Sequence, residues 1–437
     1  MLKTLHNAFK IKDIRRRIWF TLMILVVVRI GSMIHLPGVQ GDVFNNLFSS
    51  TGGASDFLDA ITGGSLSQMS IFALNITPYI TSSIIVQLLT IAFPALEEMQ
   101  RDGEQGRKKM TRITRYLTVG LALGESLAMA IGFGRGGYLV QFNALYVFEV
   151  VVALTAGSTI LMWLGERITE RGVGNGISIV LVINIISRIP QDLQTLFKQF
   201  ISGKAAAKAV LAALVILAII LAVVIMTVYL QDAERKIPVQ YSRKIAGRRS
   251  VGGTSSHIPL KVNTGGVIPV IFAQSLMQTP VILAALLGKG NGNGIGSKIL
   301  KLLSQSHWFH TAEWIYTIGA AIYVVLIIAF AYFYTSITFN PLEIADNIKK
   351  QGGFIPGIRP GKPTSDYLSG ILRSIILIGA VGLTIVTMLP IIFNGLFNAN
   401  VSFGGTSLII IVGVVIETLK QIESQMMVRN YKGFLNN

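Results

Sequence analysis

Long apolar stretches recur along the whole chain and are separated by short polar segments. Many of them are about 20 residues long, the length that an α-helix needs to cross a hydrocarbon core about 30 Å thick. They are continuous rather than alternating, which excludes a transmembrane β-barrel. The pattern predicts an all-α membrane protein with ten transmembrane helices, at 18–36, 74–95, 116–134, 145–165, 173–190, 209–229, 265–287, 314–336, 369–392 and 405–426.

Composition and charge agree with this topology. Of 437 residues 51% are hydrophobic and only 14% are charged, whereas soluble domains carry about 25% charged residues. The net charge of +17 would suit nucleic-acid binding, but the basic residues gather in alternate loops. Of 38 Lys and Arg, 29 lie on one side, 8 on the other and Arg29 inside the first span. The positive-inside rule then predicts that both termini are cytoplasmic.

The start of the chain is basic and is followed by the apolar run 18–36. This run is long and lacks a small-x-small cleavage site, so we expect an uncleaved first span rather than a signal peptide. Ten spans divide into two halves of five with opposite orientation, as in an inverted repeat. The expected units are an amphipathic N-terminus at 1–17, halves at 18–192 and 193–427, and a cytoplasmic tail at 428–437.

The second span of each half opens with a proline-interrupted stretch, at 75–80 and 265–271. Paired interruptions in two halves point to the working centre of such a protein, although Pro and Gly are common in membrane helices generally. The segment 56–72 is moderately apolar, contains Gly63-Gly64 and is too short to cross. It is typical of a re-entrant or interfacial segment, and a surface helix on the outer face is the simplest interpretation.

Two long cytoplasmic loops carry more basic residues than topology requires. The loop 231–263 combines β-branched residues, basic residues and glycines, which suggests an extended hairpin projecting from the membrane. The loop 340–366 is rich in Gly and Pro and contains Arg359. Such loops could dock anionic lipid, a nucleic acid such as ribosomal RNA, or an acidic protein face. A solvated loop that only retains orientation charge remains the alternative.

The sequence offers no catalytic or cofactor chemistry, so we expect no enzyme and no cofactor. The Gly-Lys pairs lack the following Ser or Thr of a P-loop, and the glycines 132–137 follow a membrane helix rather than a strand. His307 and His310 fit an aromatic interfacial belt better than a metal site. The chain has no cysteine. Any energy for work would come from a partner or a gradient.

Few charges lie in the predicted spans: Arg29, Glu125, Glu149 and Glu166. Each is a functional candidate because an ionisable group at mid-bilayer costs about 2.5–3.5 kcal/mol. Ion-coupled carriers need such groups at their discontinuous helices, where this chain has Ile, Thr, Tyr, Asn and Gln. An inverted-repeat secondary transporter of a small solute is therefore a weaker alternative, and a passive scaffold is a third.

Isoleucines mark the interrupted helices. Ile76 and Ile80 are four residues apart and share one helix face, as do Ile177 and Leu181 in the fifth span. Spacing alone is also compatible with ordinary packing or a lipid-facing surface.

Five long strings resemble the bacterial SecY family, the channel subunits of the general protein-secretion translocon, and cover essentially the whole chain in order. They are SIFALNITPYITSSIIVQLLT, ERGVGNGISIV, LKVNTGGVIPVIFAQS, FNPLEIADNIKKQGGFIPGIRPGKPT and FGGTSLIIIVGVVIE. The resemblance implies ten helices in two inverted halves around a central pore. It also implies translocation of unfolded secretory polypeptides and their signal sequences, with hydrophobic segments released sideways into membrane lipids.

The resemblance assigns roles to particular positions and replaces the surface-helix interpretation of 56–72 with a plug that closes the outer funnel. The implied partners are the small subunits SecE and SecG, the motor ATPase SecA and the ribosome. The implied pore ring is Ile76, Ile80, Ile177, Leu181, Ile271 and Ile410, and the plug includes Asp56, Phe57, Leu58, Ile61, Gly63, Gly64 and Leu66. The lateral gate includes Gln87, Asn263 and Ser275, and Arg248, Arg249 and Arg359 match partner-docking positions.

Overall fold

The computed structural model describes most of the chain. The described residues are 8–39, 62–137, 139–202, 206–241, 244–246, 249–251, 255–286, 294–309, 314–397 and 405–435.

Each predicted span overlaps at least one helix of the described residues. Several helices extend well past the predicted limits, because polar turns at their ends continue the helix outside the apolar stretch. The helices are α2 (Lys12–Gly31), α5 (Thr77–Ala92), α7 (Gly103–Arg135), α8 (Ala144–Arg171), α9 (Gly176–Leu196), α10 (Ala206–Asp232), α11 (Ile268–Leu286), α13 (Ile318–Thr338), α15 (Lys362–Phe397) and α16 (Gly405–Leu435).

Length and composition alone identify fewer membrane spans. Within the described residues six helices are long and apolar enough to cross: α7, α8, α9, α10, α13 and α15. The stretches counted for α9 and α13 include the helical segments that directly adjoin them. A seventh follows if α5 and the short α6 (Pro94–Arg101), which are bent by 108° at their junction, form one span. Charged residues inside α2 and α16 interrupt their apolar stretches, and α11 is short.

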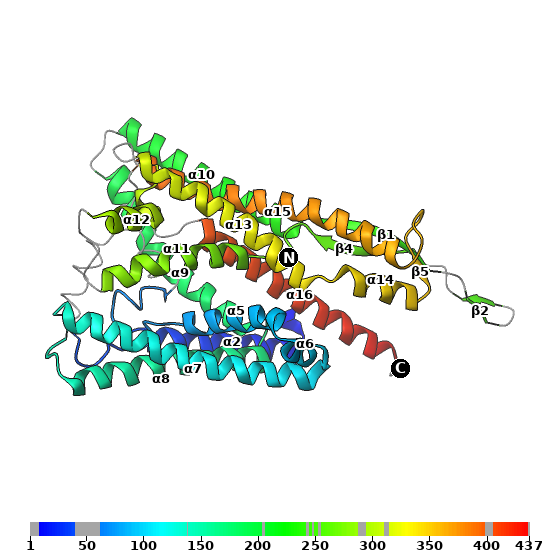
Figure 1. Ribbon diagram of the computed structural model, residues 1–437, viewed down its shortest axis with the longest axis horizontal. Coiled ribbons are helices and arrows are strands. Elements are labelled where there is room, and N and C mark those ends of the chain that lie inside the picture. The colour runs from blue at the N-terminus through cyan, green and yellow to red at the C-terminus, as the bar shows by residue number, and fades with distance from the viewer. Residues whose placement is uncertain are drawn as a thin grey trace.

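The two halves repeat one packing pattern. In the first half, the second helix (α5) packs on the third (α7), the third on the fourth (α8) and the fourth on the fifth (α9), while α2 touches α8 and α9. In the second half, α11, α13, α15 and α16 pack in the same order, and α10 touches α15 and α16. Figure 1 shows α9 and α16 between the two groups, where they contact each other.

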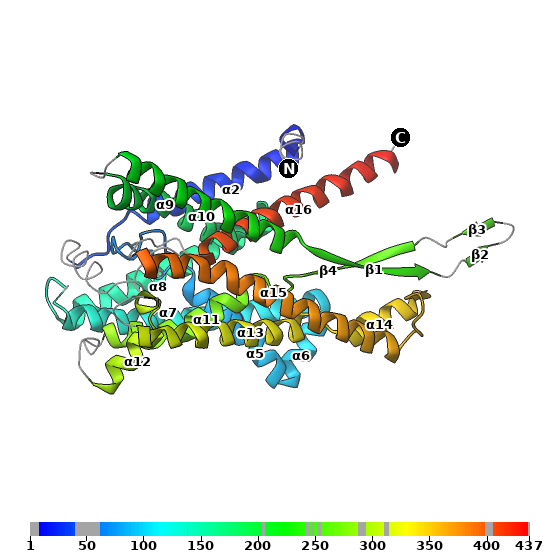
Figure 2. The ribbon, with the colours of Figure 1, turned by 90° about the horizontal axis from the view of Figure 1, so that it is seen from above.

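The loop between α10 and α11 forms the predicted hairpin. Strand β1 (Glu234–Tyr241) pairs antiparallel with β4 (Ser255–Lys261), with Ile237 opposite Ile258. The shorter β2 (Lys244–Ala246) and β3 (Arg249–Val251) pair near its tip, which extends beyond the helices in Figure 2. Ile237 and Val239 alternate with exposed residues, so one face of the hairpin is buried.

The loop 340–366 is more ordered than its Gly and Pro content suggests. It contains helix α14 (Pro341–Lys350), capped by the Asn340 side chain, which accepts a hydrogen bond from the Leu342 amide. Strand β5 (Gly353–Phe354) then pairs with β1. The two loops therefore form one three-stranded sheet, β4-β1-β5. A core beneath it joins them to α15: Ile237, Val239, Leu260, Ile348, Ile355, Leu368, Ile371 and Ile375.

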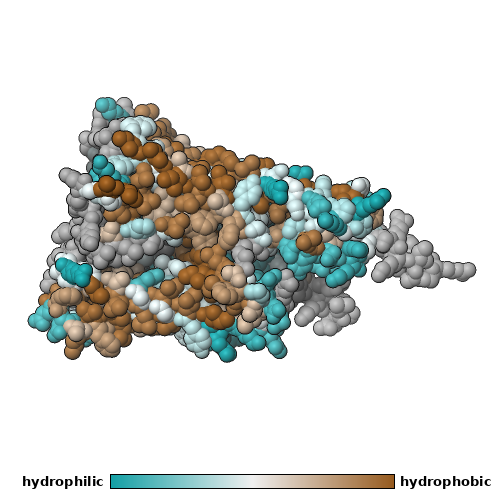
Figure 3. Space-filling view, viewed as in Figure 1, coloured by the Kyte–Doolittle hydropathy of each residue, from teal (hydrophilic) through white to brown (hydrophobic). Residues whose placement is uncertain are grey.

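The surface separates into an apolar belt and a polar end. In Figure 3 apolar side chains cover the helices, and polar side chains gather toward the end that carries α6 and α14. Helix α10 is the extreme case, because only 6% of its apolar 18-residue stretch is buried inside the protein. Such an apolar surface requires lipid or another membrane chain around it. At the opposite end lie the short α12 (Ile295–Leu303) and the π-helical turn η1 (Phe197–Ile201) after α9.

Candidate functional site: an apolar constriction between the two halves

All six residues implied as a pore ring lie in one apolar cluster. Ile76, Leu181 and Ile410 are its buried members, at 0%, 4% and 3% exposure, and Ile80, Ile177 and Ile271 pack against it from the side. They come from α5 and its N-cap, α9, α11 and α16, and so from both halves. Its three central side chains have almost no exposed surface.

Local sequence explains how α9 presents its two members of the cluster. Its N-cap Asn175 accepts a hydrogen bond from the Ser178 amide, which fixes the start of the helix. A Cβ on Gly176 would lie 1.9 Å from the carbonyl oxygen of Gly165 in α8. Only glycine permits this approach, and it brings Ile177 into the space between the halves.

The start of α5 is fixed by buried polar contacts that the sequence did not reveal. Asn75 has the positive φ of 51° that asparagine tolerates better than most residues. Its side-chain oxygen accepts a hydrogen bond from Asn184 Nδ2 at 3.1 Å, and its carbonyl accepts one from Ser158 Oγ at 3.0 Å. These contacts hold Ile76 in place, with Pro78 at the first turn of the helix. The sequence feature that could have indicated these contacts is Asn75, three residues before Pro78.

The structure describes part of the implied plug. Gly63 and Gly64 are buried and Leu66 is 6% exposed, packed in a second apolar cluster with α7 and α8. The other implied plug residues, Asp56, Phe57, Leu58 and Ile61, lie outside the described residues.

The implied gate residues lie on different elements of the structure. Gln87 is half-buried on α5, Asn263 is 7% exposed after β4, and Ser275 is exposed on α11. No hydrogen bond joins Gln87 to Asn263 among the described residues, and the Asn263 Nδ2 atom has no partner there.

The implied docking arginines lie at the polar end. Arg359 is exposed, and its carbonyl accepts a hydrogen bond from Thr364 Oγ1 at 2.8 Å, which fixes the turn before α15. Arg249 belongs to β3, near the tip of the hairpin, and Arg248 lies outside the described residues.

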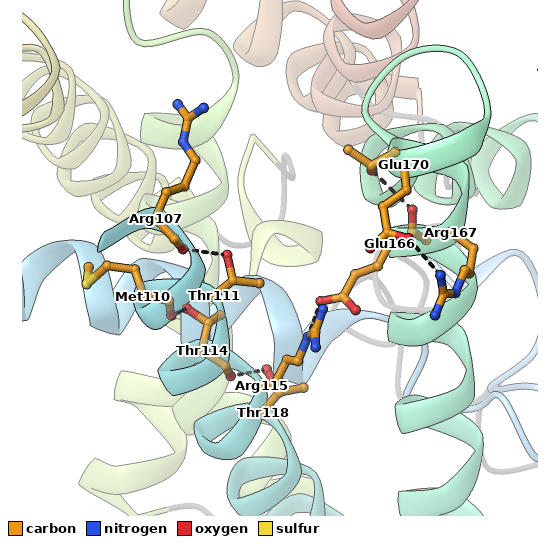
Figure 4. A network of polar contacts seen from close by, with 11 residues as sticks. Arg107, Met110, Thr111, Thr114, Arg115, Thr118, Glu166, Arg167 and Glu170 are labelled. Carbon is orange, nitrogen blue, oxygen red and sulfur yellow. Dashed lines mark hydrogen bonds and ion pairs between the residues drawn. The ribbon is translucent and has the colours of Figure 1, made fainter. Parts of the chain in front are cut away.

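An ion pair ties two helices of the first half together (Figure 4). Arg115 Nε on α7 donates to Glu166 Oε1 on α8 at 2.7 Å, and the Glu166 side chain is 15% exposed. Arg167 pairs with Glu170 one turn further on, also at 2.7 Å. Glu166 is therefore part of a frame that joins α7 to α8, rather than a coupling group at a helix break.

Other candidate chemistry is not assembled. In the part of the chain that the structure describes, no three His, Asp or Glu side chains gather in a way that could hold a metal ion. His307 lies edge-on to Tyr316, with 6.1 Å between ring centres. His310 falls outside the described residues.

Comparison with known proteins identifies the architecture. The family model for SecY matches residues 70–419. The chain belongs to the SecY family. SecY proteins named protein translocase subunit SecY are similar along their entire length: 41% identical in Halalkalibacterium halodurans, 44% in Streptomyces galbus and 42% in Bacillus subtilis, with 100% of each chain covered. As a SecY-family chain with several apolar helices, it is a multi-pass membrane protein.

Solved structures share the fold at low sequence identity. One, described as a protein-conducting channel, matches with a TM-score of 0.64 and 21% identity, covering 95% of this chain and 93% of that one. A Sec61 chain from a canine ribosome–channel complex matches with a TM-score of 0.59 and 17% identity, again covering 95% and 93%. No comparison supports the secondary-transporter alternative.

Proposed function

We propose that this chain is the channel subunit of a protein translocase rather than an enzyme. It passes unfolded secretory polypeptides across the bacterial cytoplasmic membrane and releases hydrophobic segments sideways into lipid. The observation that carries the proposal is the apolar constriction, in which Ile76, Leu181, Ile410 and their three neighbours converge from both halves. Full-length similarity to protein translocase subunits supports it.

An apolar constriction suits a channel for polymers. A translocating chain presents every kind of side chain and an unpaired backbone, so a pore lined with donors and acceptors would bind segments and stall. Branched aliphatic side chains offer little specific attraction and can deform around large residues. They also disfavour a continuous water column, which restricts ion flow when no polypeptide is present.

We further propose the finer architecture that the sequence implies. Ten helices cross the membrane in two inverted halves, with both termini in the cytoplasm. The repeated packing order of the two halves supports the division into five and five. The units are the N-terminus 1–17, the halves 18–192 and 193–427, and the tail 428–437, which α16 enters as a continuous helix as far as Leu435.

Sideways release requires an opening between α5 and α11, the proposed lateral gate that carries Gln87, Asn263 and Ser275. A hydrophobic segment that leaves through it is stabilised by about 25 cal/mol for each Å² of apolar area removed from water. A polar segment gains nothing in lipid and continues through the pore. Opening needs signal sequences and docked partners that bind the open state more tightly than the closed one.

The joined cytoplasmic sheet is the proposed docking surface for the motor SecA and the ribosome. Its basic residues, together with Arg359, Arg248 and Arg249, would recognise acidic protein or RNA. SecE and SecG are the proposed small membrane subunits, and the largely unburied α10 shows that apolar surface is available to such neighbours.

Polar replacement in the constriction tests the proposal. Ile80→Asn combined with Ile271→Asn should let ions leak through the purified complex and relax selection of signal sequences. The matched control is Leu89→Asn with Leu276→Asn, on the same two helices but 36% and 57% exposed. A scaffold would keep both sealing and selectivity in every variant. Equal behaviour of the two double variants would refute a constriction at this cluster.

A further inference from the structure

A short amphipathic helix lies at one end of the second half. Helix α12 is at the end of the molecule opposite to α14 (Figure 1), on the side that the proposed orientation places outside. Its sequence, IGSKILKLL, combines a row of apolar residues with two lysines. Such a helix is typical of a segment that lies in the membrane interface, with its apolar face toward acyl chains and its basic residues toward headgroups.

Packing fixes which face of α12 remains on the outside. The carbonyl of Leu302 accepts a hydrogen bond from Nε1 of the buried Trp308 at 2.9 Å. A Cβ on Gly319, in the first turn of α13, would lie 1.9 Å from the same carbonyl oxygen, so only glycine permits this approach of the two helices. Since Gly319 belongs to the predicted span 314–336, α12 lies at the level where that span begins.

The exposed side of α12 is apolar. Ile295 and Ile299, one turn apart, are 80% and 51% exposed. The 3-10 turn η3 (Trp314–Thr317), which contacts α12, adds the exposed side chains of Trp314 and Ile315. Single exposed apolar residues are ordinary, but four on two touching elements form a patch that favours an apolar neighbour.

A cation stands beside this patch. Lys298 is exposed and, three residues after Ile295, shares its side of the helix. Among the described residues no ion pair or hydrogen bond engages its ammonium group, whereas Lys301 lies over the ring of Tyr316, 5.7 Å from the ring centre. Glu313, the nearest acidic residue in the sequence, lies outside the described residues. The surface therefore offers one ammonium group next to branched aliphatic side chains.

We infer that α12 lies in the outer membrane interface and that Lys298 binds the phosphate of an anionic phospholipid of the outer leaflet, whose acyl chains cover Ile295 and Ile299. A lysine can lay its stem along apolar surface and keep its ammonium group at headgroup level. An apolar segment of another membrane chain would cover the isoleucines but leave Lys298 without an anion. The inference goes beyond the proposed function and takes from it only the orientation in the membrane. Helix α12 contacts α11, so the lipid would lie next to a helix of the proposed lateral gate.

The experiment places the complete purified complex in lipid nanodiscs that contain photoactivatable phosphatidylglycerol or, in parallel, photoactivatable phosphatidylcholine with the same acyl chains. Mass spectrometry then counts cross-links within residues 294–303. Phosphatidylglycerol should exceed phosphatidylcholine there, and Lys298→Gln should lower its cross-linking about fivefold, the factor in affinity that one basic residue near an anionic lipid surface contributes. Lys298→Arg should keep it. The matched control Lys108→Gln removes an exposed lysine that already pairs with Glu104 at 2.9 Å, and it should change nothing at α12.

Equal cross-linking of the two lipids at α12, or phosphatidylglycerol cross-linking that Lys298→Gln leaves unchanged, would overturn the inference. Little cross-linking of either lipid would overturn it as well, because another chain would then cover this surface. The same loss in Lys108→Gln as in Lys298→Gln would show an effect of net charge rather than a site on α12.

The side of the membrane is checked separately. The chain has no cysteine, so Lys298→Cys provides a single thiol that should react with a membrane-impermeant maleimide added outside intact cells. Reaction only after the cells are opened would refute the outer leaflet. None of these measurements needs transport, so their failure leaves the channel function standing, whereas an Ile80→Asn and Ile271→Asn double variant that does not leak would count against that function alone.

Discussion

Shortening Leu260 to alanine removes buried volume from the core that joins the loops 231–263 and 340–366. Leu260 is 2% exposed and packs with side chains from β1, α14 and α15. Substitutions of this kind cost about 2–5 kcal/mol, depending on how far the cavity collapses. Since about 1.4 kcal/mol is a factor of ten in an equilibrium constant, the population of the opened sheet should rise by about 30-fold to 4,000-fold.

Amide hydrogen exchange of the purified complex measures this directly. Protection of the β1 and β4 amides should fall by that factor in Leu260→Ala, while α7 and α8 stay unchanged. His257→Ala, an exposed position on the same strand, should change protection by about twofold at most. Partner docking should weaken with the resting ion seal intact. Unchanged protection of β1 in Leu260→Ala would refute the interpretation that the sheet and α15 form one packed unit.

Three further changes probe docking, the buried amides and the helix frame. Arg359→Glu should abolish motor-dependent translocation into membrane vesicles while insertion and orientation stay normal, and unchanged export would contradict a docking role. Asn184→Ala removes a donor to the buried Asn75 and should lower unfolding stability by about 1–3 kcal/mol, seen as a lower melting temperature of the complex; an unaltered melting temperature would argue against this contact. A double-mutant cycle on Glu166 and Arg115 should give a coupling of at most about 1 kcal/mol that shrinks with salt, and a salt-independent coupling would disagree with the partly exposed geometry.

Hydropathy predicted where helices lie, because a helix in lipid must satisfy its own backbone and expose apolar side chains. It could not show which face of a helix points inward, since lipid-facing and interior surfaces of membrane helices are similarly apolar. The spacing of Ile76 and Ile80 placed them on one face, but only the resemblance to SecY gave that face a role. The structure then brought both into a cluster with Ile271 and Ile410.

The contacts that sequence reasoning missed join residues far apart in the chain. Strand β5 has two residues and pairs with β1 more than one hundred residues earlier, so no periodicity marks it. The contact of Asn184 with Asn75 likewise depends on how α9 packs beside the start of α5. The hairpin 231–263 was predictable because its pairing is local and its composition favours strands.

A disulfide trap between a halted secretory polypeptide and the constriction tests the central claim most directly. The chain contains no cysteine, so single cysteines at Ile76 or Ile410 can be read without background. Val26 on α2, which is 59% exposed on the apolar surface, is the matched lipid-facing control. We expect the halted polypeptide to cross-link at Ile76 and Ile410 and not at Val26. Cross-links at Val26 with none at Ile76 or Ile410 would show that the polypeptide takes another route.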